Sequence, residues 1–214
     1  RNVAVSSGQA IEHIALVVGG APSQLVLTSE LPPTAVVGTP LPLVLEARDT
    51  QGNAVAGIPI RFRVTAGNGT VSPTVVTTET TVHAETTCQA GTTLRVGTTA
   101  GVNQLEAWVD GMERPVSFTV LGTPDRSSPR LIRVSGNNQV APPGEELREP
   151  LVVRLEDRFV NPLPGETVTA RIIQGDARFL SSQDVLAQAT TLSDGTARFA
   201  LQVGTRDATI VTRI

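Results

Sequence analysis

The residues with catalytic or metal-binding side chains are few, and they form no recognisable pattern. His13 and His83 are the only histidines, and neither belongs to a His-Glu-x-x-His arrangement that could hold zinc. One cysteine, Cys88, allows neither an intrachain disulfide nor a cysteine-based zinc site. No serine occupies a Gly-x-Ser-x-Gly motif, and no glycine-rich phosphate loop is present. The sequence therefore predicts a protein that is not an enzyme and that binds no metal or cofactor.

Two aspartates stand four positions before an asparagine, each just ahead of a predicted turn. Asp49 precedes Asn53, and Asp157 precedes Asn161. Carboxylate and amide oxygens at a turn are calcium ligands, but this spacing matches no calcium-binding loop. Asp and Asn side chains more often close turns by hydrogen bonds to their own backbone. We expect turn closure, with calcium as the weaker alternative.

Three other features have a structural and a functional interpretation. Trp108 is the only tryptophan, and we expect it in a sandwich core rather than at a binding hot spot. Cys88 is expected to be a small core residue, the alternative being an intersubunit disulfide. The threonine-rich stretch 74–87 suits a β-strand, the alternative being O-linked glycans on an exposed face.

Composition favours a folded, mostly β protein. The chain has 214 residues, 40% of them hydrophobic and 17% charged, with 19 glycines and 15 prolines. The net charge is −3 and no block of basic residues occurs, so we expect no nucleic-acid partner. No apolar run approaches the roughly 18–20 residues of a membrane span.

Strict alternation of apolar and polar residues dominates the chain, which is typical of half-buried β-strands. Ile58–Val64 and Pro115–Val120 are good examples. Turn signals such as Gly67-Asn68-Gly69 and Asp194-Gly195 recur every 8–12 residues. This spacing predicts a β-sandwich or barrel.

The chain contains two copies of one pattern in the same order. Each copy has an apolar strand ending in Asp, a turn containing Asn and Gly, and a second, alternating strand. These segments are 42–49, 53–57 and 60–64 in the first copy, and 150–157, 161–165 and 168–172 in the second. We therefore predict an N-terminal extension, 1–21, and two tandem domains, 22–123 and 124–214, joined by a short Gly/Pro/Ser-rich connector.

These motifs resemble bacterial immunoglobulin-like domains of the invasin and intimin kind. The family pattern is a strand ending in Asp, a Gly-Asn turn, Pro-Val-x-Gly, an alternating strand, a Gly-rich turn with Thr, then Thr-Asp-x-x-Gly-x-Ala and Gly-x-Asn. The matching residues in the first copy are Asp49, Gly52, Asn53, Val55, Gly57, Phe62, Val64, Gly69, Thr70, Gly101, Val102 and Asn103. Those in the second are Asp157, Asn161, Leu163, Gly165, Asp194, Gly195, Thr196, Ala197, Leu201 and Gly204. The Thr-Asp-x-x-Gly-x-Ala element is replaced in the first copy by the threonine-rich stretch.

The resemblance implies an all-β fold of two tandem immunoglobulin-like sandwiches. It also implies an extracellular location on a bacterial cell surface, and a role as the spacer or tip of an adhesin without enzymatic activity. A host or cell-surface receptor would then be the partner of the whole adhesin.

The ends of the chain are out of phase with the repeats. The first copy finishes with two strands, Leu105–Val109 and Val116–Leu121, whereas the second reaches only Ala208–Ile214. The second domain is thus expected to lack its last strand, and residues 1–21 to carry an extra one. A sandwich without an edge strand exposes core side chains and unpaired backbone groups.

One solution is donor-strand complementation, in which one copy lends a strand to the next. Because the contact is head-to-tail, it would build a filament or pilus from copies of this chain. The donor residues would be Ile11, Ile14, Leu16 and Val18, and the acceptor edge Ile210, Val211 and Ile214.

Two other interpretations compete with a filament. In the first, the chain is a spacer segment of a longer adhesin, and residues 1–20 are the last hairpin of a preceding domain, with Asn2–Val5 as its penultimate strand. In the second, it is a receptor-binding module, for which Ser181–Ala189 is the best candidate for an exposed loop. A third, an accessory domain of a carbohydrate-active enzyme, would need a catalytic domain elsewhere.

Overall fold

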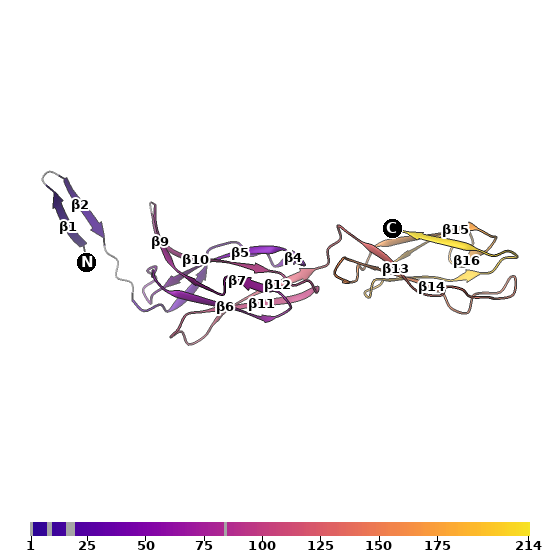
Figure 1. Cartoon of the computed structure of the whole chain (residues 1–214), viewed down its shortest axis with the longest axis horizontal. Helices are drawn as coiled ribbons and strands as arrows, with labels where there is room; N and C mark the ends of the chain where they lie inside the picture. The colour runs from indigo at the N-terminus through magenta and orange to yellow at the C-terminus, as the bar shows by residue number, and fades with distance from the viewer. Residues whose placement is uncertain (1, 8–9, 16–19, 84) are drawn as a thin grey trace. The chain divides into compact units, whose positions relative to one another are not determined.

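The computed structural model describes the backbone of residues 2–7, 10–15, 20–83 and 85–214, and side chains from residue 20 onward except 80–88. Every regular element in this part of the chain is a β-strand, so the predicted all-β class is confirmed (Figure 1). The chain divides into two compact units, Arg1–Thr123 and Pro124–Ile214. We call them unit 1 and unit 2.

The strands of unit 1 follow the alternating segments of the sequence. They are β1 (Asn2–Ser7), β2 (Ala10–Ala15), β3 (Gln24–Leu27), β4 (Thr34–Val36), β5 (Pro40–Arg48), β6 (Pro59–Ala66), β7 (Thr70–Ser72), β8 (Val75–Thr77), β9 (Glu79–His83), β10 (Glu85–Arg95), β11 (Gly101–Trp108) and β12 (Val116–Thr123).

Unit 1 is a sandwich of two sheets around one core. One sheet has the order β3-β5-β10-β7, and the other has β4-β12-β11-β6-β8. β9 also pairs with β10 in the first sheet, and from β3 to β8 consecutive strands alternate between the two sheets, as in immunoglobulin domains. Apolar side chains from both sheets meet in the core, among them Leu43 and Leu45 of β5, Ile60 of β6, Leu105 of β11 and Val120 of β12, each with 0% exposure.

The strands of unit 2 repeat this arrangement. They are β13 (Arg130–Ser135), β14 (Leu151–Glu156), β15 (Thr167–Gln174), β16 (Arg178–Phe179), β17 (Leu186–Thr190), β18 (Thr196–Phe199), β19 (Leu201–Gln202) and β20 (Thr209–Arg213). One sheet has the order β13-β14-β18, the other has β17-β15-β20, and β16 pairs with β19. In the described residues of unit 2, no strand pairs with the second edge of β20.

The N-terminal segment forms two strands where we expected one extra strand. β1 and β2 pair antiparallel, with Val3 opposite Ile14 and Val5 opposite Glu12. Such a hairpin is what the alternative interpretation of residues 1–20 requires, with β1 in the place of a penultimate strand.

Two expectations about individual segments are wrong. Trp108 is not a core residue: it is half-buried, because strand alternation puts its neighbours Ala107 and Val109 into the core and turns Trp108 outward. The stretch Ser181–Ala189 is not a long loop, since β17 begins at Leu186 and pairs with β15.

The threonine-rich stretch adopts the predicted β structure. It contains β8, β9 and the start of β10. Between β8 and β9, Thr78 is buried, and its hydroxyl donates to the carbonyl of Val55 at 2.9 Å and accepts the N–H of Ile58 at 3.0 Å. Cys88 lies in a part of β10 whose side chains are outside the described residues.

Candidate functional site

β20 of unit 2 is the counterpart of β11 of unit 1, and a shared irregularity fixes the alignment. In unit 1 the pairing of β11 with β6 shifts register between Gln104 and Leu105. In unit 2 the pairing of β15 with β20 shifts at the matching place, beside Thr209 and Ile210. Ile210 therefore occupies the place of Leu105.

A shared turn aligns the segment on the opposite side. In unit 1 the Thr39 N–H donates to the carbonyl of Val36 at 3.1 Å, around Gly38 with φ +79°. In unit 2 the Glu145 N–H donates to the carbonyl of Pro142 at 3.1 Å, around Gly144 with φ +83°. The segment 140–142 thus corresponds to β4.

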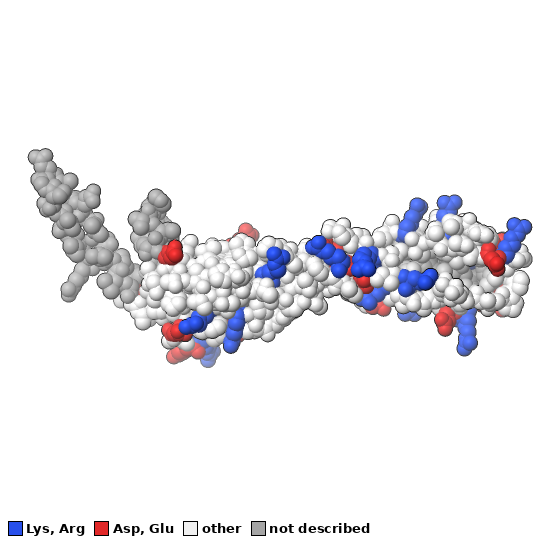
Figure 2. All heavy atoms as spheres, viewed as in Figure 1, with Lys and Arg blue, Asp and Glu red and all other residues white. Residues whose placement is uncertain are grey.

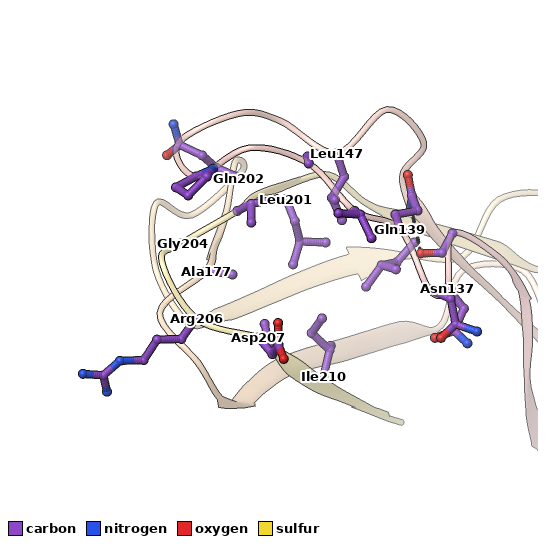
Figure 3. Close-up of a pocket in the computed structure, with 18 of the residues that line it drawn as sticks. Asn137, Gln139, Leu147, Ala177, Leu201, Gln202, Gly204, Arg206, Asp207 and Ile210 are labelled. Atoms are coloured by element: carbon purple, nitrogen blue, oxygen red, sulfur yellow. Dashed lines mark hydrogen bonds between the residues drawn. The ribbon is translucent and has the colours of Figure 1, made fainter.

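Between these two elements unit 1 has a strand and unit 2 has an open groove. In unit 1, β12 lies between β11, with which it is antiparallel, and β4, with which it is parallel. In unit 2 the same place is a hollow of about 470 Å³, lined on one side by 136–141, Pro143 and Leu147 and on the other by 201–208 and Ile210. Figure 3 shows Leu147 and Ile210 facing the hollow from opposite sides, whereas Arg206 points away.

The groove leaves apolar side chains incompletely covered. Leu147 and Ile210 pack against the core of unit 2 but are only half-buried, whereas Leu105, the counterpart of Ile210, has 0% exposure. Val140, on the other rim, is 98% exposed. Among the described residues, ten of the fourteen exposed large hydrophobic side chains belong to unit 2. Polar residues such as Asn137, Gln139 and Asp207 line the groove together with these apolar side chains.

The predicted acceptor residues divide between two faces of β20. Ile210 lines the groove. Val211, 45% exposed, follows it and by strand alternation points to the other face. Ile214 is 54% exposed, just beyond the end of β20. Sequence reasoning missed the opposite wall, because residues 136–143 form no strand and carry no alternating pattern.

The predicted donor residues are only partly placed. The backbones of Ile11 and Ile14 lie in β2, paired with β1, and nothing in the structure describes their side chains. Leu16 and Val18 lie outside the described residues. The structure therefore does not bring donor and acceptor together.

The Asp–Asn pairs close their turns and also bind the segment that leads into each unit. In unit 1, Oδ1 of Asp49 accepts the N–H groups of Gln51 and Asn53, both at 2.9 Å, and Oδ2 accepts the Gly20 N–H at 3.2 Å. The Asn53 side-chain amide donates to Oδ2 at 3.2 Å. We call this arrangement the Asp–Asn clamp.

Unit 2 repeats the clamp almost atom for atom. Asp157 has 0% exposure, and its Oδ1 accepts the N–H groups of Phe159 at 2.8 Å and Asn161 at 2.9 Å. Its Oδ2 accepts the Asp125 N–H at 3.0 Å and the Asn161 side-chain amide at 2.8 Å. These donors occupy the lone pairs that a calcium ion would need, so the clamp explains the Asp–Asn motif without a metal.

Hydrogen bonding lowers the pKa of both carboxyl groups, Asp49 and Asp157. Bonds from the Asn53 side chain, and then from backbone N–H groups, lower the pKa of Asp49 from 3.8 to about 2, against the opposing effect of burial. Burial opposes ionisation of Asp157, but the bonds from Asn161 and from three backbone N–H groups together outweigh it and lower its pKa as well.

We expect unit 1 to lose stability in acid through Asp49. A carboxyl group whose pKa is about 2 when folded and near 3.9 when unfolded stabilises the fold above pH ~4, and this contribution is lost as the pH falls towards 2. Trp108, the only tryptophan, lies in unit 1, so its fluorescence reports unfolding of unit 1 alone. The urea midpoint read from Trp108 should fall between pH 6 and pH 2.5, and less steeply in Asp49→Asn. An equal pH dependence in both proteins would contradict this role.

The connector between the units is one residue long, because the residues on either side of it make contacts within their own units. Thr123 still belongs to β12, and its carbonyl accepts the Val37 N–H at 2.9 Å. Asp125 is already bound to unit 2 through Asp157 and through Arg158, whose Nε lies 3.3 Å from Oδ2 of Asp125. Arg126 then pairs with Glu166. Only Pro124 separates the two sets of contacts.

Charges are scattered in small pairs of opposite sign. Arg61 lies 3.2 Å from Asp110, and Arg63 lies 2.6 Å from Glu106, with its guanidinium 5.3 Å from the centre of the Trp108 ring. Figure 2 shows no continuous patch of one sign on the visible face of the described residues. Trp108 is thus covered by a surface arginine.

Two kinds of feature can be judged in the described part of the chain: metal-binding clusters and membrane-spanning helices. Its residues include no cluster of three or more His, Cys, Asp or Glu able to hold a metal ion, and none of them forms a helix that could span a bilayer. His13 and His83, like Cys88, belong to stretches whose side chains are outside the described residues.

The fold defines a class: tandem immunoglobulin-like β-sandwiches. No protein-family model and no curated protein matches the sequence. Solved structures do match. They include the Escherichia coli adhesin FdeC, with 15% identity, a TM-score of 0.48, and coverage of 95% of this chain and 63% of that one.

Two further structures belong to the kind predicted from the sequence. The D0–D1 domains of intimin share 15% identity with a TM-score of 0.38, over 90% of this chain and 91% of that one. Invasin, a bacterial integrin-binding protein, shares 20% identity with a TM-score of 0.41, over 89% of this chain and 36% of that one. The expected resemblance to the invasin and intimin kind is confirmed, and this chain spans about two thirds of FdeC and about a third of invasin.

Proposed function

We propose that this chain is a non-enzymatic spacer segment of an adhesin on a bacterial cell surface. The observation that carries the proposal is the repeated Asp–Asn clamp. Each unit binds its own lead-in segment and has its own core, so the unit and its lead-in form one self-contained repeat. Repeats of this kind add length without needing a site of their own, and any receptor contact would lie elsewhere in the adhesin.

Mechanical unfolding tests the proposal directly. Pulled from both ends, the chain should unfold in two separate events, because the two cores share no residue. At up to about 3.6 Å per residue, unit 2 should release about 330 Å of chain. Residues 20–123, which form the sandwich of unit 1, should release about 370 Å. A single event releasing the whole length would contradict independent repeats.

A cell-attachment experiment distinguishes a spacer from a receptor-binding tip. Beads coated with the chain should attach to cultured host cells no better than beads coated with an unrelated immunoglobulin-like domain. Saturable attachment that free chain competes away would favour the receptor-binding module instead.

The groove in unit 2 favours a second candidate function. A sandwich that lacks its last strand can take one from another molecule, so copies could join head to tail by donor-strand complementation and form an extracellular filament. Light scattering of the purified chain tests it: growth of the particle size with concentration supports the filament, and a concentration-independent monomer contradicts it.

A further inference from the structure

We propose that the outer face of the sheet β17-β15-β20 in unit 2 binds a protein that presents a carboxylate among apolar side chains. The centre of this face is Arg171 of β15, and the apolar residues around it are Ile173 of β15, Leu186 of β17 and Val211 of β20. We call these four residues the Arg171 face. The proposal goes beyond the spacer role, because a spacer needs no partner along its length.

The register of the sheet places three of these side chains in one row. Arg171 is paired with Leu186 on one side and with Val211 on the other. Its neighbours Ala170 and Ile172 are buried in the core of unit 2, so Arg171 points outward, and residues paired directly with it point the same way. Because β15 is the middle strand of the three, strands that the structure describes form both sides of Arg171.

Unit 1 carries an arginine at the position of Arg171, and this arginine has a partner. The repeated pattern matches segment 60–64 with 168–172, so Arg63 corresponds to Arg171. Arg63 lies opposite Glu106 in the sheet, with a nitrogen–oxygen distance of 2.6 Å between the two side chains. In unit 1 this position therefore holds a guanidinium that pairs with a carboxylate across the strands.

Unit 2 keeps the arginine and replaces the carboxylate with an apolar side chain. The alignment of β20 with β11 places Val211 where unit 1 has Glu106. Among the residues that the structure describes, no carboxylate forms an ion pair with Arg171. The strands β15, β17 and β20 contain no Asp or Glu, and Arg213 adds a second positive charge. The charge of this face is therefore complementary to a carboxylate from outside the unit.

The apolar residues of the Arg171 face are open to solvent. Leu186 is 43% exposed, Val211 45% and Ile173 57%. An arginine among apolar side chains resembles an interface hot spot, in which exclusion of water strengthens a charge-assisted bond. A protein is favoured over an anionic polysaccharide because apolar side chains of the partner would cover this apolar area. A second copy packed through the same face is disfavoured, since it would bring arginine against arginine.

Selection from a library of random peptides displayed on phage tests the proposal. Peptides that bind the full chain should carry Asp or Glu beside apolar residues. A selected peptide should bind Arg171→Gln at least about tenfold more weakly, and replacing its acidic residue with the corresponding amide should have a similar effect. The matched control is Arg133→Gln, which removes an exposed arginine from β13 in the other sheet of unit 2 and should leave binding unchanged.

A second variant blocks the face without removing the arginine. Val211→Glu places a carboxylate opposite Arg171, as Glu106 lies opposite Arg63 in unit 1. This variant should fold normally, because the position is 45% exposed, and it should bind the selected peptides at least about tenfold more weakly than Val211→Gln. Far-ultraviolet circular dichroism verifies the fold of each variant.

The same variants distinguish a protein from other occupants. Leu186→Ser should weaken peptide binding at least about threefold, since part of the apolar contact is lost. Alginate, a carboxylated polysaccharide, should bind much more weakly than the peptides. Alginate binding of equal strength, with no effect of Leu186→Ser on either probe, would overturn a protein partner in favour of a general anion site. A selection that yields no peptide dependent on Arg171 would overturn the site itself, and would leave the spacer proposal intact.

Discussion

Replacing Phe179 with alanine should lower the free energy of unfolding of unit 2 by about 3–5 kcal/mol. The Phe179 side chain has 0% exposure, and its ring centre lies 5.8 Å from that of Phe199 in a tilted arrangement. The substitution removes the largest fully buried side chain and leaves a cavity in a small core. Since a domain of this size is stable by only about 5–14 kcal/mol, a large part of its stability would be lost.

The two units can be followed separately in this experiment. Far-ultraviolet circular dichroism reports on both, and Trp108 fluorescence reports on unit 1 alone. Phe179→Ala should move the part of the dichroism transition that belongs to unit 2 and leave the fluorescence transition in place. Leu192→Ala, at a 54% exposed position of the same unit, is the matched control and should change stability by less than about 0.5 kcal/mol. Equal effects of the two substitutions would contradict the described core.

Replacing Asp157 with alanine should be the other large effect, costing unit 2 about 3 kcal/mol. The carboxylate accepts three backbone N–H groups and the side-chain amide of Asn161, and it is fully buried. Alanine leaves these donors without their acceptor in a place that water does not reach. Asp157→Asn should cost less, because one oxygen remains to accept hydrogen bonds.

Asp157→Ala should also have a measurable local effect on the segment that leads into unit 2. Loss of the bond to Asp157 frees the Asp125 N–H, so its hydrogen exchange should accelerate. Trypsin should also cleave faster after Arg126, which lies in the same segment. Asp184→Ala, at an exposed turn, is the control and should alter neither rate. Unchanged exchange at Asp125 in Asp157→Ala would show that the clamp does not hold the lead-in segment.

Local patterns in the sequence were enough to predict the sandwiches. Alternation located the strands, and the repeated Asp and Asn positions located the turns that Asp49 and Asp157 close. The bond from the clamp to the lead-in segment could not be predicted, because it joins Gly20 to Asp49, 29 positions apart, and Asp125 to Asp157, 32 positions apart. No local pattern encodes such a pairing.

The prediction that Trp108 is a core residue was wrong because it did not apply the alternation of inward and outward positions along the strand. Trp108 was assigned to the core by residue type, although Leu105 and Ala107 already placed the inward face on odd positions. The far wall of the groove was missed on other grounds: β4 is a strand only where β12 pairs with it, so its counterpart at 140–142 has no regular structure to predict.

The one-residue connector at Pro124 has a consequence for how such chains can change. Since each unit carries the carboxylate that binds its own lead-in segment, the boundary makes no demand on the identity of the preceding unit. Duplication, loss or exchange of a repeat at this boundary would leave every bond of the clamp intact. Recombination could therefore alter the number of repeats without any compensating substitution, and the length of such a protein could evolve faster than its fold.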